Sequence, residues 1–142
     1  MQNKKVVLKS IEFYIPQKAP FVMVSELVFA NDKEAQTRFY IEDNNVLCEN
    51  GKLDESGLIE NIAQTAAAMT GFNAIKNGAE VKKGFIGSVD KLIITKLPQT
   101  QEFIDTKVVI LNTVMNVHII KGTITQKDLP IAECEMKIFL EE

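Results

Sequence analysis

The chain has 142 residues, 46% of them hydrophobic, and a formal net charge of −3 at pH 7. A chain of this length builds one core, so we expect a single domain over residues 1–142. Lys and Arg do not cluster, which argues against nucleic-acid binding because phosphates need grouped basic side chains. Two distant cysteines, Cys48 and Cys134, and one histidine provide neither a CxxC motif nor a zinc ligand set. We therefore expect no metal or other cofactor and a reducing, cytoplasmic location.

Membrane insertion is not expected either. The apolar run near the N-terminus covers only two to three residues, too few for a signal peptide. No stretch of the chain is long and apolar enough to span a bilayer.

The first third of the chain predicts a β-hairpin and a loop. Residues 21–30 form a β-rich run after Pro20, and residues 35–41 alternate between apolar and polar side chains. The turn Asn31-Asp32 separates the two runs. Residues 42–52 are polar and contain Asp-Asn-Asn and Asn-Gly turn signals, so they read as a loop.

A long, nearly all-apolar helix follows, with one carboxylate inside it. Asp54 or Ser56 can cap its start, and Asn77-Gly78 ends it. A helix that is apolar on most faces has to be buried, and burying Glu60 without a partner is costly. Gln64 lies one turn further on the same face, and Asn61 adjoins Glu60. This cluster of polar groups indicates a functional site.

Four strands are predicted after the helix, over residues 84–97, 102–115, 117–126 and 129–140. The last alternates clearly, with Cys134 and Met136 on one face and Glu133 and Glu135 on the other. Two strands, one buried helix and four antiparallel strands describe an α+β domain in which a sheet wraps around a helix. At this size the pattern is that of the hotdog fold, and a generic α+β domain with another strand order is the alternative.

Three motifs spread along most of the chain also match the pattern of a known family. Residues 15–24 read Ile-Pro-Gln-Lys-Ala-Pro-Phe-Val-Met-Val, residues 60–64 read Glu-Asn-Ile-Ala-Gln, and residues 85–90 read Phe-Ile-Gly-Ser-Val-Asp. They resemble the Leu-Pro-His-Arg-x-Pro-Phe opening, the Glu-Ala-Met-Ala-Gln helix and the Phe-x-Gly-Ile-Asp strand of the β-hydroxyacyl-acyl-carrier-protein (ACP) dehydratases. Residues 48–67 are most similar to the dehydratases of aryl-polyene and flexirubin pigment clusters.

The resemblance implies a dehydratase-like protein of fatty-acid or polyene-type biosynthesis, acting on a 3-hydroxyacyl chain carried by ACP or coenzyme A. Dehydration removes an α-proton, expels the β-hydroxyl group and needs a donor to the thioester oxygen. By the resemblance, Glu60 is the catalytic carboxylate and Gln64 accompanies it. The backbone N–H of Gly57, at the positive end of the helix, is the donor.

The histidine that works with this carboxylate in the family is absent. Where the family has Gly-His-Phe-Pro-Gly, this chain has Glu-Asn-Gly-Lys-Leu at residues 49–53, and the histidine of the opening motif is Gln17. His118 falls in a predicted strand, where a lone histidine is usually structural or exposed. Cys48 and Glu49 are nearer in sequence to the missing histidine, but a thiol needs a basic neighbour to ionise.

Three functions therefore remain open. The first is a dehydratase in which Glu60 works with a group other than histidine. The second is a hotdog acyl thioesterase, in which a helix carboxylate acts on the ester or on water without a histidine. The third is a non-catalytic acyl-binding subunit of a dehydratase heterodimer. In each, ACP or coenzyme A presents the acyl chain, and we expect a homodimer or a heterodimer with another hotdog subunit.

Overall fold

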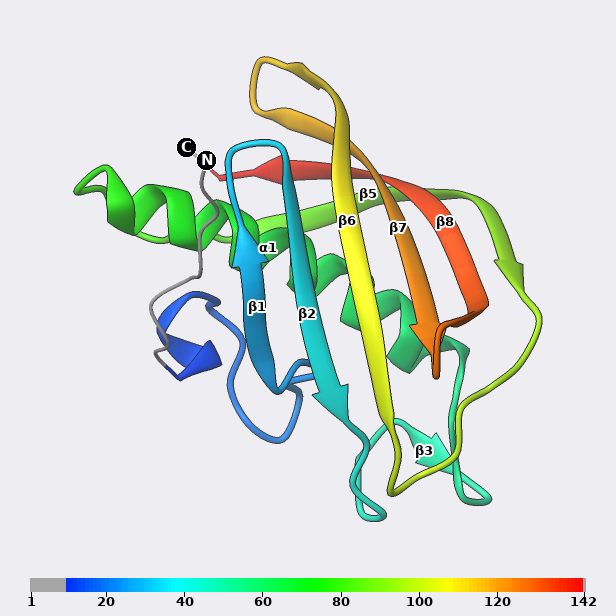
Figure 1. Ribbon diagram of the computed structural model, residues 1–142. Helices are drawn as coiled ribbons and strands as arrows, with labels where there is room; N and C mark the ends of the chain where they lie inside the picture. The colour runs from blue at the N-terminus through cyan, green and yellow to red at the C-terminus, as the bar shows by residue number, and fades with distance from the viewer. Residues whose placement is uncertain (1–9, 142) are drawn as a thin grey trace.

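A six-stranded antiparallel sheet curves around one long helix in the computed structural model, which describes residues 10–141 (Figure 1). The strand order is β1-β2-β6-β7-β8-β5. The helix α1 spans Glu55–Lys76 and lies against the concave face of the sheet. The strands are β1 (Glu26–Ala30), β2 (Glu34–Tyr40), β5 (Gly84–Ile94), β6 (Phe103–Val114), β7 (Val117–Gln126) and β8 (Leu129–Leu140).

Three further elements are small. A short 3-10 helix, Ile11–Phe13, precedes the sheet, and two two-residue strands, β3 (Cys48–Glu49) and β4 (Lys52–Leu53), pair within the loop before α1. The helix begins after Asp54, whose side chain accepts a hydrogen bond from the Gly57 backbone, and it ends at Asn77. Of the two predicted caps, Asp54 is the one that acts. No helix in residues 10–141 is long and apolar enough to cross a membrane.

The helix and the sheet approach each other closely where a glycine removes a side chain. A Cβ atom added to Gly122 of β7 would lie 2.4 Å from Cγ2 of Ile62, well inside van der Waals contact. On the other side of the helix, a Cβ on Gly71 would lie 1.8 Å from the backbone oxygen of Tyr14. The first contact sets how closely α1 approaches β7, and the second sets how closely α1 approaches the segment at Tyr14.

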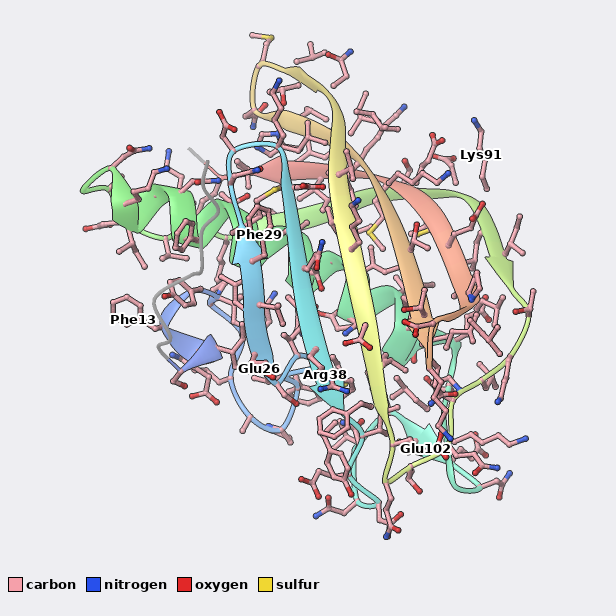
Figure 2. The ribbon with its side chains drawn as sticks, in the orientation of Figure 1. Phe13, Glu26, Phe29, Arg38, Lys91 and Glu102 are labelled. Carbon is pink, nitrogen blue, oxygen red and sulfur yellow. The ribbon has the colours of Figure 1, made fainter. Side chains whose placement is uncertain are left out.

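The outer face of the sheet carries charged side chains on β2 and β6. Figure 2 shows Arg38 on β2, whose Nε lies 3.3 Å from Oδ1 of Asp105 on β6 and whose guanidinium stacks 4.2 Å from the centre of the Phe103 ring. Along β2 and β6, exposed and buried side chains alternate, so one face of the sheet meets water and the other packs against α1 as part of the core.

The predicted hotdog arrangement is confirmed, but the first strand is shorter than its β-rich run. β1 begins only at Glu26, because the backbone of residues 21–23 is bonded to the helix instead of to a strand. The N–H of Met23 donates to Oε1 of Gln64, and the carbonyl oxygen of Phe21 accepts from Nε2 of the same side chain. A glutamine on the helix thus occupies the groups that would otherwise extend the strand.

Candidate active site

A cavity of about 260 Å³ lies between α1 and the neighbouring strands β5, β7 and β8. One wall is a stripe of helix residues spaced three or four apart, which places them on one face: Glu60, Ala63, Ala67 and Thr70. The small side chains after Glu60 leave the space open. The opposite wall is mainly apolar and is formed by Phe85, Ile86, Ile120, Ile138 and Leu140. Among residues 10–141, Glu60 is the one carboxylate that lines this cavity.

Gln64 holds the carboxylate of Glu60. Its Nε2 donates to Oε2 of Glu60 over 2.9 Å and to the backbone oxygen of Phe21 over 2.8 Å. Its Oε1 accepts from the N–H of Met23 over 2.7 Å, and the side chain has no exposed surface. Because both N–H directions of the amide and its oxygen are engaged, Gln64 has one orientation, and it presents a donor to Glu60.

Asn61 has a different task. Its Nδ2 donates to the backbone oxygen of Met23 over 2.8 Å, and its Oδ1 accepts from Oγ1 of Thr106 over 2.6 Å. Asn61 is fully buried, so it ties the helix to residue 23 and to β6 and does not face the cavity. The predicted polar cluster therefore divides into a carboxylate at the cavity and two amides that fix the helix.

Gly57 lies at the start of the helix, as expected, but its N–H is already engaged. It donates to Oδ1 of Asp54 over 3.1 Å and lies 3.0 Å from the backbone oxygen of the same residue. Gly57 does not line the cavity, and a Cβ there would lie 2.4 Å from Cδ1 of Leu53. The role of this N–H as a donor to substrate stays a prediction, and it requires Asp54 to release the N–H.

His118 lines the same cavity as Glu60, which the sequence did not indicate. It lies two positions before the buried Ile120 on β7, so both side chains point to the concave face. Its Nδ1 is 3.0 Å from Oγ1 of Thr113, within hydrogen-bond distance. Burial lowers the pKa of the imidazole below its usual value of 6.5, which favours the neutral ring. The signal that could have placed it is its parity with Ile120 on the strand.

The two cysteines do not supply the missing group. Cys48, in β3, does not line the cavity, and burial, then Asp54 and Asp43, raise the pKa of its thiol. Burial and nearby carboxylates raise the pKa of Cys134 to about 11. Both remain thiols at neutral pH and are poor nucleophiles. Within residues 10–141, no group of three or more His, Cys, Asp or Glu side chains is arranged to hold a metal ion.

Comparison with known proteins identifies the class. Residues 9–141 match the model of the ApeP-like family, described as ApeP dehydratase, and the chain belongs to this family. This confirms the expected membership in the hotdog dehydratases and the relation to aryl-polyene proteins. A search of curated protein sequences finds no match.

Solved structures share the fold. The dehydratase heterocomplex ApeI:P from Xenorhabdus doucetiae superposes with a TM-score of 0.87 at 14% identity, covering 94% of this chain and 92% of that one. A hypothetical thioesterase with coenzyme A from Streptococcus pneumoniae gives 0.65 at 11% identity, with 82% and 84% covered. The uncharacterized protein PH1136 from Pyrococcus horikoshii gives 0.70 at 11% identity, with 99% and 96% covered.

The half-buried imidazole of His118 predicts a pH-dependent stability. Because the folded-state pKa of His118 is depressed, the unfolded chain binds a proton below about pH 6.5 that the folded chain does not, so the free energy of unfolding falls as the pH falls. Urea denaturation of the natural chain and of His118→Gln at pH 7.5 and 5.5 should show a smaller loss in the variant. Lys121→Gln, exposed on the same strand, serves as control. Equal losses in all three proteins would contradict a lowered pKa of His118 in the folded chain.

Proposed function

We propose that this chain is the carboxylate-bearing subunit of a dehydratase that acts on 3-hydroxyacyl thioesters presented by ACP, with coenzyme A as the alternative carrier. The observation that carries the proposal is the single carboxylate, Glu60, held by Gln64 at the wall of an apolar cavity in a chain of a dehydratase family. An apolar cavity with few polar groups suits an acyl chain with one reacting end. A cytoplasmic location belongs to the same proposal.

Dehydration needs a second titratable group besides Glu60. One group takes the α-proton and another gives a proton to the departing β-hydroxyl, which leaves as water. His118 and Glu60 line the same cavity, but Nδ1 of His118 is paired with Oγ1 of Thr113, and no hydrogen bond joins the imidazole to Glu60 within residues 10–141. We therefore propose that the second group comes from another chain.

The free edge of the sheet is where that other chain would bind. β5 is one of the two edge strands of the sheet, and on it the side chains of Phe85, Ile86 and Ile93 are 56%, 41% and 53% exposed. An unpaired apolar edge favours pairing with a strand of another subunit. Phe85 and Ile86 also line the cavity, so a subunit on this edge would lie beside the site of Glu60. The comparison with a dehydratase heterocomplex supports a hotdog partner.

A charged residue on this edge should weaken association. Ile93→Lys places an ammonium group in the proposed interface, whereas Leu129→Lys alters a side chain that is 68% exposed after the β7–β8 turn. We expect the natural chain and Leu129→Lys to sediment as dimers at micromolar concentration, alone or with a second hotdog subunit, and Ile93→Lys to shift towards monomer. A natural chain that sediments only as a 15.9 kDa monomer in both conditions would contradict the proposal.

Removing the carboxylate should abolish the chemistry and leave the fold intact. Glu60→Gln keeps the shape of the side chain, and we expect a loss of about 10²–10⁴-fold in water elimination. The assay is mass spectrometry of 3-hydroxyacyl-ACP incubated with the protein and a histidine-containing hotdog subunit. Glu55→Gln, exposed in the first turn of α1, is the matched control. Full activity of Glu60→Gln, or its unfolding in mild denaturant, would refute the catalytic assignment.

The same assay tests the thioesterase alternative, which the fold similarity to a hypothetical thioesterase supports. In that case Glu60 would activate water or attack the thioester, and free acid would appear in place of the dehydrated thioester. Binding of acyl-ACP without either product, with or without the second subunit, would leave the role of a non-catalytic acyl-binding subunit.

A further inference from the structure

Two amide side chains of α1 hold Met23, in the segment before β1, at both of its backbone groups. The N–H of Met23 donates to Oε1 of Gln64 over 2.7 Å, and its carbonyl oxygen accepts from Nδ2 of Asn61 over 2.8 Å. Among residues 10–141, no backbone group bonds to either atom. Met23 has no exposed surface, so both groups would be buried and unpaired without the amides. The position of Met23 therefore depends on Asn61 as much as on Gln64.

The position of Met23 decides which end of the Gln64 amide faces Glu60. A glutamine amide can be placed in two ways that exchange its oxygen and its nitrogen. The N–H of Met23 can only donate, so it requires Oε1 of Gln64 on its side. Nε2 of Gln64 is then turned to Oε2 of Glu60, 2.9 Å away. The group that holds Met23 thus also sets the hydrogen bond to the proposed catalytic carboxylate.

Asn61 is itself anchored to the sheet. Its Oδ1 accepts from Oγ1 of Thr106 on β6 over 2.6 Å, which fixes the plane of the amide. Thr106 is 3% exposed and Asn61 has no exposed surface, so water does not compete for this bond. A continuous chain of hydrogen bonds therefore runs from the sheet to the carboxylate, through Thr106, Asn61, Met23, Gln64 and Glu60.

We propose that Asn61 and Thr106 are positioning residues for the reaction of Glu60. Neither lines the cavity, and they act by holding Met23 so that Gln64 keeps its donor on the carboxylate. This inference rests on the proposed function. Because neither residue touches substrate, their loss should lower kcat and leave KM unchanged.

Thr37 provides a matched control on the neighbouring strand. Thr37 on β2 and Thr106 on β6 are register partners, and both are buried. The hydroxyl of Thr65 donates to the backbone oxygen of Asn61, so Thr37 is the donor in its 2.7 Å bond to Thr65. Thr37→Val and Thr106→Val each delete one buried hydroxyl that ties α1 to the sheet. Only Thr106→Val breaks the chain of hydrogen bonds to the carboxylate.

The kinetic test is elimination of water from 3-hydroxyacyl-ACP by the full chain together with a histidine-containing hotdog subunit. We expect Thr106→Val to lower kcat about tenfold with KM unchanged, because a small misplacement of a catalytic group costs this much. Thr37→Val should leave kcat within about twofold, and Thr106→Ser, which retains the hydroxyl, should restore it. Asn61→Leu should lower kcat by about 10²-fold. If Asn61→Leu does not fold, the two valine variants decide.

A second readout needs no substrate. Hydrogen exchange of the Gln64 side-chain amide, followed by NMR in the chain alone, should be about tenfold faster in Thr106→Val than in Thr37→Val. Equal kcat or equal exchange in the two valine variants would show that Thr106 serves the fold alone and would overturn the inference. The proposed function would still stand if Glu60→Gln is inactive in the same assay. Absence of turnover by the natural chain would contradict the proposed function itself, and the inference with it.

Discussion

The side-chain amide of Gln64 is the interaction on which the rest of the site depends. It is fully buried, and two of its three hydrogen bonds join α1 to Phe21 and Met23, while the third holds the carboxylate of Glu60 on the same helix. Breaking any of them leaves a buried polar group unpaired, which costs more than a hydrogen bond contributes. One amide therefore fixes the position of the segment before β1 and keeps residues 21–23 out of the strand. The same amide orients the carboxylate of Glu60 at the cavity.

The cavity follows from the same geometry. Asn61 and Gln64 face the segment at residues 21–23, and Glu60 faces the space between the helix and the edge of the sheet. Small residues follow Glu60 on its face, so the helix does not fill this space. The edge strand β5 closes one side and leaves apolar side chains exposed. A carboxylate, an apolar cavity and an incomplete edge together describe a site that a second subunit completes, as we propose.

Local pattern predicted the elements well and the site less well. The bounds of β7 and β8 equal the predicted ranges because alternation and tight turns are local signals, and the hotdog arrangement followed from their order. Glu60, singled out from the sequence, lines the cavity, but the sequence could not separate its position from that of Asn61, because that depends on which face of the helix meets residue 23. The parity of His118 with Ile120 gives its face of the strand, but which elements surround that face depends on the packing of the whole chain, as does the position of Gln17.

Hydrogen exchange of the Gln64 side-chain amide, followed by NMR, tests the central claim most directly. The account predicts that both of its protons exchange far more slowly than those of Gln36, which is exposed on β2, and that Glu60→Gln shifts the Gln64 amide resonances. A Gln64 amide that exchanges as fast as that of Gln36, with resonances unmoved by Glu60→Gln, would contradict it.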